Sequence, residues 1–239
     1  MRDGGALIAL GLILALTAVL YGVVRQVTEE QIYQRFIYRA EQERNALIFR
    51  LNAHAQVLRG GAAFFEASGS VNREEWRNYV SHLRLAETLP GIQATGLALM
   101  IQPTEKAVHE AAIRATGFPS YAIKPNGKRE QYSSIVFLEP FSEINQRAFG
   151  YDMFSDPVRR HAMERARDSG QPALSGRITL LQEKIEKPQP GFLIYVPVYR
   201  PRMPHDSPTE RRMALLGFTY SAFRAQDLLG AVYNPGNKD

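Results

Sequence analysis

The stretch that decides the fold runs from residue 149 to residue 182 and reads FGYDMFSDPVRRHAMERARDSGQPALSGRITLLQ. It predicts a loop with an acidic residue, then a short capped helix, then a strand. Ser155 or Asp156 can accept hydrogen bonds from the first helical turn, and Pro157 suits the first helical position, where its missing N–H costs nothing. Gly170 suits the end of the helix, because glycine adopts the left-handed cap conformation without strain.

Composition narrows the class of protein. The chain has 239 residues, of which 45% are hydrophobic and 22% charged, as in an ordinary globular protein of one large or two small domains. The net charge of +5 is spread along the chain, whereas a nucleic-acid-binding surface needs clustered cations, so no nucleic acid is expected as a partner. The chain has no cysteine, which excludes disulfides, thiolate zinc sites and cysteine nucleophiles.

The N-terminus predicts a membrane anchor. Residues 4–24 contain no charged side chain, and about 20 apolar residues are enough to span a bilayer. A signal peptide, the main alternative, would have a shorter apolar core and a cleavage site of small residues. The flanking charges, Arg2 and Asp3 on one side and Arg25 on the other, are too few to orient the anchor.

A long helix is expected after the anchor, because residues 25–59 contain neither Pro nor Gly. Apolar residues at heptad-type spacing form a seam along it: Tyr33, Ile37, Ala40, Leu47, Leu51 and Leu58, interrupted by Arg44 and His54. The seam either packs on the helix's own domain or pairs with a second copy of the chain as a stalk. Both arrangements are possible in one molecule, at different positions along the helix. His54 is expected to be a structural interruption and not a ligand.

The remainder predicts further helices and several strands. Gly60 and Gly61 are expected to break or kink the long helix. Further helices are expected after the capping box of Asn72 and Glu75, after Thr104 and from Ser221. Strands are expected at residues 92–101, 132–138, 173–181, 192–199 and 213–220, with exposed loops at residues 183–191 and 201–208. Strands joined mostly by hairpins indicate an α+β fold with an antiparallel sheet.

Eight segments carry a family resemblance. They are FFEASGSVNREEWRNYV, LPGIQATGLALMI, QYSSIVFLEP, GYDMFSDP, ARDSGQPAL, SGRITLLQE, PGFLIYVPVYRP and LLGFTYSAFRAQDLL. In order and spacing the chain resembles the CHASE domain, the extracytoplasmic sensor of bacterial membrane receptors and plant cytokinin receptors. The resemblance implies a long helix supporting two PAS-like subdomains, with the ligand pocket in the one distal to the membrane. It also implies a bacterial inner-membrane protein with a periplasmic sensor, feeding a histidine kinase, diguanylate cyclase or adenylyl cyclase through a second membrane helix.

The chain departs from a full receptor of that kind. Residues 213–233 are the best candidate for a second membrane span, but Arg224 and Asp227 interrupt them. No cyclase or kinase motif is present. We expect an anchor at residues 1–25, a stalk helix at residues 26–60 and a sensor domain at residues 61–239 whose membrane-proximal part is incomplete. The alternative is a complete short protein.

The resemblance names candidate ligand-binding residues. In the plant receptors an aspartate before the short helix binds an adenine-type ring, helped by a backbone group of a leucine on the next strand. The matching positions are Asp152 and Leu174, and Ser175 and Arg177 lie near the same strand. A carboxylate in a mostly apolar cavity can accept from a ring N–H. Asp152 can equally cap a local turn, Leu174 can be ordinary core, and Arg177 can be solvated or meet an anion.

Other chemistry has little support in the sequence. No HExxH or GxSxG motif and no phosphate-binding glycine loop is present, so neither an enzyme nor a cofactor is expected. Arg159, Arg160, Arg165 and Arg167 are expected to form a solvated helix face paired with Glu164 and Asp168, or less simply to contact an anionic lipid or partner. Two functions remain: a ligand-sensing input domain, homodimeric through the stalk, or a ligand-free dimerisation and partner-sensing module.

Overall fold

The structure is a computed structural model that describes residues 3–89, 91–181 and 190–233. The chain divides into two compact units, residues 1–48 and residues 49–239. Helix α1 (Asp3–Ala67) runs from the first unit into the second. Near its N-terminus it is long and apolar enough to cross a membrane, which agrees with the expected anchor on length and composition, criteria that a signal sequence also meets.

The expected break at Gly60 and Gly61 is wrong, because α1 continues through both glycines to Ala67. The reason is packing against helix α2 (Arg73–His82). A Cβ on Gly60 would lie 2.8 Å from the Tyr79 hydroxyl, and one on Gly61 would lie 3.4 Å from the Trp76 ring. The glycines therefore let α2 approach α1 closely, at a cost in helix propensity that the packing offsets.

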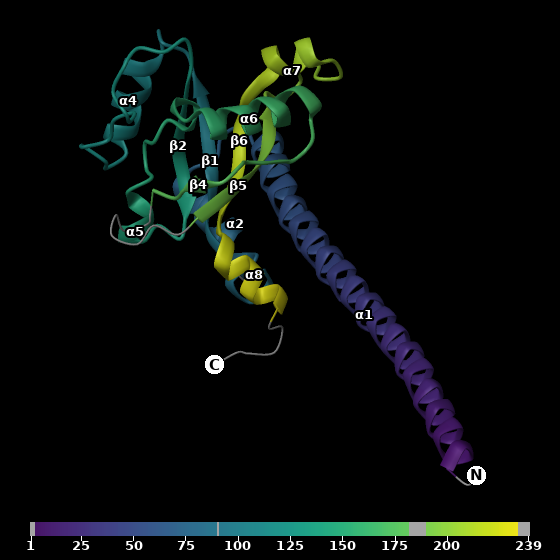
Figure 1. Cartoon of the computed structure of the whole chain (residues 1–239). Coiled ribbons are helices and arrows are strands. Elements are labelled where there is room, and N and C mark those ends of the chain that lie inside the picture. The colour runs from purple at the N-terminus through teal and green to yellow at the C-terminus, as the bar shows by residue number, and fades with distance from the viewer. Residues whose placement is uncertain (1–2, 90, 182–189, 234–239) are drawn as a thin grey trace. The chain divides into compact units, whose positions relative to one another are not determined.

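The second unit is built around one antiparallel sheet, as Figure 1 shows. Its order is β2-β1-β6-β5-β3, and a sixth short strand, β4, pairs with β5. The strands are β1 (Ile92–Ile101), β2 (Tyr132–Glu139), β3 (Ala173–Leu174), β4 (Ile178–Thr179), β5 (Pro190–Tyr199) and β6 (Leu215–Arg224). The expected α+β class with an antiparallel sheet is confirmed.

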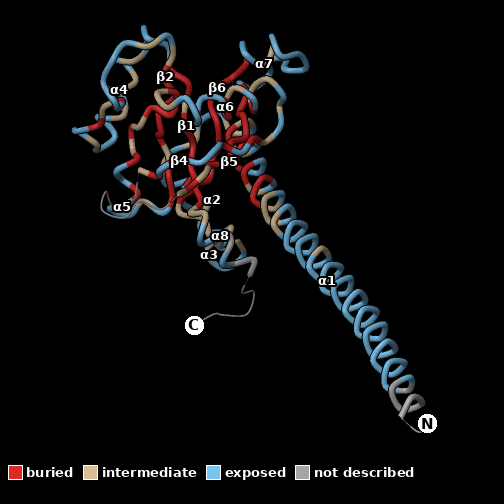
Figure 2. Tube along the Cα trace, in the orientation of Figure 1, coloured by how far each residue is buried: buried red, intermediate tan, exposed pale blue. Residues whose placement is uncertain are grey.

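Both faces of the sheet are buried, as the red strands in Figure 2 show. Along β6, Phe218 and Tyr220 belong to the apolar cluster that includes helix α6 (Pro157–Ser169). The intervening Thr219 points to the opposite face, where its hydroxyl donates to the Leu58 carbonyl of α1 at 3.0 Å. Successive side chains of β6 therefore point to opposite faces of the sheet, where one set packs against α6 and the other against the end of α1.

Local caps explain most of the helix boundaries. The Asn72 and Glu75 capping box begins α2, as expected. The Asp156 carboxylate accepts from Val158 N and Arg159 N at the start of α6, which ends at Gly170 in the left-handed conformation. The other helices are α3 (Leu85–Thr88), α4 (Lys106–Ala115), α5 (Glu143–Gln146), the 3-10 helix η1 (Met153–Ser155), α7 (Pro208–Ala214) and α8 (Ala225–Tyr233).

Several expected boundaries are wrong. Thr104 does not cap α4, which begins after Glu105 without a side-chain cap. The expected strand at residues 173–181 is two short strands, β3 and β4. The expected loop at residues 201–208 is confirmed as far as Ser207, but α7 follows it, begun by the capping box of Ser207 and Glu210, and delays the expected strand from residue 213 to residue 215. Ser221 lies within β6, because the buried alternation continues to Phe223. Most of the other expected loop, residues 182–189, lies outside the described residues.

The seam of α1 packs on its own unit at its C-terminal end. Leu58 and His54 are buried there, and the His54 imidazole meets the Phe223 ring edge-on at 4.6 Å between centroids. Its Nδ1 is buried without a hydrogen-bond partner. Burial, assisted by the nearby positive charge of Arg50, lowers the pKa of His54 from 6.5 to about 4.

We expect acid to destabilise this unit through His54. The folded-state pKa lies below the unfolded value, so the unfolded chain binds the proton more tightly and stability falls as pH drops from about 6.5 towards 4. The expected loss at pH 5 is about 2 kcal/mol. Chemical denaturation of the full chain in detergent, followed by fluorescence of the single tryptophan, Trp76, measures it. His54→Leu should remove this loss, so that the free energy of unfolding changes less between pH 6.5 and pH 5. The exposed control His82→Leu should keep the loss. Equal pH profiles of unfolding for the two variants would show that His54 is not the group responsible.

Candidate functional site

Asp152 lies at the join between three segments and has no exposed surface. Its Oδ1 accepts from Ser133 N of β2 at 2.8 Å and from Phe154 N of η1 at 3.1 Å. Its own N–H donates to the Lys124 carbonyl at 2.6 Å. The preceding Gly150 permits this approach, since a Cβ there would lie 2.5 Å from the Ala122 carbonyl oxygen. The carboxylate therefore caps η1 and ties it to β2.

The second carboxylate oxygen of Asp152 is left without a hydrogen bond. Oδ2 is buried, and its nearest charged neighbour is Nη1 of Arg129 at 3.4 Å. Burial raises the pKa of Asp152, whereas the Ser133 N–H and the Arg129 guanidinium act to lower it. A buried polar atom without a hydrogen bond costs about 1–3 kcal/mol of folding free energy. Oδ2 is therefore a buried acceptor that a donor from outside the protein could satisfy.

A cavity of about 540 Å³, here called the Asp152 cavity, is connected to Asp152 through Arg129, which lines it and pairs with the Asp152 carboxylate. It is lined by Arg129, Glu130, Gln131, Phe154, Arg160, Glu164 and Arg167. The mostly apolar cavity expected around Asp152 is not what borders it, because most of the lining residues are charged. The volume lies in the range of small-molecule sites.

Further buried polar groups without hydrogen-bond partners lie on the face of the sheet that packs against α6. The hydroxyls of Tyr195 and Tyr220 and the Oγ of Ser133 are buried and make no hydrogen bond of good geometry. Tyr195 and Tyr220 are paired across β5 and β6. Burial raises the pKa of both phenols, and the nearby Arg159 guanidinium opposes the rise. Buried polar groups without partners are uncommon, so each needs a bound water, ion or ligand, or a functional role, to account for it.

Arg159 does not belong to a solvated face, contrary to expectation. Its side chain is buried, Nη2 donates to the Thr179 carbonyl at 3.0 Å and the guanidinium lies 5.1 Å from the Tyr151 ring centroid. Its Nε lies 3.7 Å from the Asp156 carboxylate and makes no hydrogen bond. The expected pairing of Arg167 with Asp168 is confirmed at 2.7 Å.

The other candidate residues lie away from the Asp152 cavity. Leu174 is half-exposed on the edge strand β3, and its carbonyl accepts from Arg165 of α6 at 2.8 Å. Ser175 has a structural bond instead: its Oγ accepts from Leu193 N at 2.9 Å and extends the pairing with β5. Arg177 is exposed. In the part of the chain that the structure describes, no hydrogen bond or ion pair joins Asp152 to any of the three.

Sequence reasoning missed most of the lining of the cavity. Arg160, Glu164 and Arg167 recur at spacings of four and three residues, which places them on one face of α6. That spacing was visible in the sequence, but a charged helix face usually meets solvent. The loop before β2 supplies Arg129, Glu130 and Gln131, and nothing in its sequence indicates that it folds against α6.

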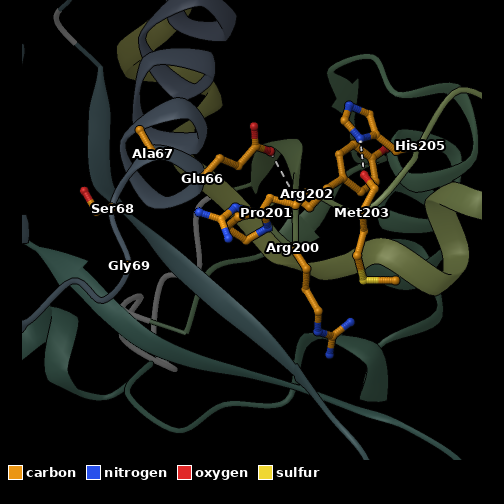
Figure 3. Close-up of a pocket in the computed structure, with 10 residues that line it drawn as sticks. Glu66, Ala67, Ser68, Gly69, Arg200, Pro201, Arg202, Met203 and His205 are labelled. Carbon is orange, nitrogen blue, oxygen red and sulfur yellow. Dashed lines mark hydrogen bonds between the residues drawn. The ribbon is translucent and has the colours of Figure 1, made fainter.

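A larger cleft of about 670 Å³ lies elsewhere in the same unit (Figure 3). Its polar groups are mostly bound to the protein itself. Glu66 accepts from Tyr199 N at 2.9 Å, and His205 stacks on the Tyr199 ring while its Nδ1 meets the Met203 carbonyl. Arg200 donates to the carbonyls of Met213 and Leu215. The cleft therefore offers a ligand fewer free groups than the Asp152 cavity does.

Comparison with known families agrees with this geometry. The profile of the CHASE domain matches residues 69–238, most of the chain and all of the sheet. The chain belongs to the CHASE domain family. No curated protein matches it. CHASE domains are extracytoplasmic sensory domains of receptors and not catalytic domains. The polar cavity described above is therefore a candidate ligand-binding site. Among the described residues no cluster of His, Asp or Glu could hold a metal ion.

The structural role of Asp152 predicts a graded response to substitution. Asp152→Ala leaves the buried N–H groups of Ser133 and Phe154 without an acceptor and should lower the free energy of unfolding by about 2 kcal/mol. Asp152→Asn keeps an acceptor for both N–H groups and should lose less than half of that. Chemical denaturation checks the order; equal losses for the two variants would show that the cap is not what holds η1 to β2.

Proposed function

We propose that this CHASE domain is the ligand-sensing input domain of a membrane-bound signal-transduction receptor. The observation that carries the proposal is the fully buried Asp152 carboxylate, whose Oδ2 lacks a hydrogen bond beside a cavity of about 540 Å³. Family membership supports the sensory role. A ligand that offers a donor to Oδ2 would remove an unfavourable buried acceptor, which is a source of binding energy.

The candidate ligand-binding residues are Asp152 together with Leu174, Ser175 and Arg177. Leu174 is opposite Ile194 of β5 while the next residue, Ser175, donates its N–H to Leu193; hydrogen-bonded pairs alternate in an antiparallel ladder, so the Leu174 N–H is directed away from β5 at the sheet edge, where a ligand could meet it. Ser175 fixes the course of that strand, and Arg177 is accessible in the following turn. A ligand that reaches from Asp152 to Leu174 would have to displace the side chains of α6 that lie on this strand.

The strand order β2-β1-β6-β5-β3, with a helix on one face, supports a PAS-like fold for the sensor. In such an arrangement the ligand meets η1 and α6, and β6 leads directly into α8 at the other end of the unit. A ligand changes the output only by its difference in affinity for two arrangements of these elements. We infer that β6 and α8 carry that difference towards the membrane.

The cellular setting follows from the family and the anchor. We propose a bacterial inner-membrane protein whose α1 begins as the membrane anchor, with the sensor in the periplasm. We keep the domain limits proposed from the sequence: an anchor to residue 25, a stalk to residue 60 and a sensor beyond it. The helix itself extends further, because α1 ends at Ala67. The output would be a histidine kinase or a nucleotide cyclase carried by a parent protein.

Ligand binding at Asp152 can be tested on the full chain in nanodiscs. A screen of purines and common metabolites by thermal unfolding should find at least one compound that raises Tm. Asp152→Asn should remove that shift while keeping the fold, and the exposed control Asp206→Asn should keep it. If no compound raises Tm, the sensor proposal fails; if Asp152→Asn responds as the wild type does, the site is elsewhere.

A second candidate function is a ligand-free module that dimerises or senses a partner protein. It is favoured by the exposed apolar side chains of α1, among them Ile32, Tyr33 and Phe36, each about 60% exposed. Single cysteines at Ile37 or Leu47 would be unique, because the chain has none of its own. Disulfide crosslinking in membranes should join two chains through these positions if the stalk pairs, and an uncrosslinked chain at both positions would rule pairing out.

A further inference from the structure

We propose that the ligand of the Asp152 cavity is a small zwitterion of the amino-acid type. The inference rests on the proposed sensory function and names the chemical class that this cavity would accept. The lining carries both signs of charge: Arg129, Arg160 and Arg167 against Glu130 and Glu164. The pairing of these five groups decides which of them are free for a ligand.

Two of the three arginines are already engaged. Arg129 lies 3.4 Å from the Asp152 carboxylate and donates to the Pro125 carbonyl at 3.1 Å. Arg167 binds Asp168 through two nitrogens, at 2.7 and 3.3 Å. The Arg160 guanidinium makes no hydrogen bond or ion pair within the described residues, although its charge opposes the rise in the pKa of Asp152 that burial causes. The free cation of the cavity is therefore Arg160.

Both glutamates of the cavity are also free. Neither the Glu130 nor the Glu164 carboxylate has a hydrogen bond or an ion pair in the described ranges, and the Glu164 charge raises the pKa of Arg212. A simple anion that binds Arg160 would meet two unpaired carboxylates, and a simple cation would meet three guanidinium groups. A zwitterion satisfies both signs, with its acid on Arg160 and its ammonium on Glu164, in the geometry that charge-assisted hydrogen bonds favour.

The α6 helix sets the separation of the two ends. Arg160 and Glu164 are four residues apart, so their side chains leave the helix on the same face, one turn apart. Phe154 also lines the cavity and offers an apolar surface to the ligand side chain. Glu130 and Gln131, from the loop before β2, complete the lining together with Arg129 and Arg167. The cavity thus recognises an acid and an amine that are close together, as in an α-amino acid.

Matched probes test the inference on the full chain in nanodiscs. Each common α-amino acid is compared with its N-acetyl form, which lacks the cation, and its amide, which lacks the anion. We expect at least one free amino acid to raise Tm, and both blocked forms to bind about tenfold more weakly or worse by titration calorimetry. Free amino acids without effect, or blocked forms that bind equally well, would overturn the zwitterion.

Variants locate the binding on α6. Arg160→Gln and Glu164→Gln should each weaken binding of the amino acid about tenfold, because each removes one charged partner. Arg147→Gln, an exposed arginine outside the cavity, should leave affinity unchanged. Equal affinities for Arg160→Gln and Arg147→Gln would overturn the assignment. A neutral purine that binds, and whose binding Asp152→Asn abolishes, would overturn the zwitterion but keep the sensor; no binding by any metabolite would end both.

Discussion

Burying the Asp152 carboxylate is the constraint on which this face of the domain depends. An ionised group without exposed surface is tolerated only where donors surround it. Two backbone N–H groups, from Ser133 and Phe154, and the guanidinium of Arg129 meet that need, and they come from β2, η1 and the loop before β2. Because no single element supplies them, the carboxylate fixes three segments relative to one another. The position of η1 in turn sets where α6 begins, two residues later.

The two faces of the sheet differ in how their buried polar groups are satisfied. On one face Thr219 and Phe223 pack against α1, and the buried polar atoms there serve packing, as the Thr219 bond to Leu58 does. On the other face the hydroxyls of Tyr195 and Tyr220 lack partners beneath α6. Because the two sets of side chains alternate along the same strands, the packing of α6 and the packing of α1 depend on the position of the same strand backbones.

Helix boundaries that depend on neighbouring residues could be predicted from the sequence, whereas contacts between distant segments could not. Asn72 with Glu75, and Asp156 with Pro157 and Gly170, specify their helices through neighbours in the chain. Gly60 and Gly61 gave the wrong prediction, because the reason for them is a helix that lies outside their own segment. Asp152 was singled out by family resemblance and turn chemistry, and its role towards a ligand stays a prediction. The sequence does not indicate that Arg129 and Arg160 line one cavity, because nothing local to a charged residue says which distant segment it lies against.

The charge of the cavity also bears on what sensing requires here. Arg160 and Glu130 are exposed and Glu164 is half-buried, so a ligand gains only the difference between water and the cavity for each of them. Oδ2 of Asp152 is different, because it is buried and already lacks its hydrogen bond. Arg129 connects the two, since it lines the cavity and pairs with Asp152. Displacing Arg129 would leave the Asp152 carboxylate less compensated, whereas a ligand acid held by Arg160 leaves the Arg129 pair in place. The lining of the cavity and the compensation of Asp152 thus share one guanidinium group.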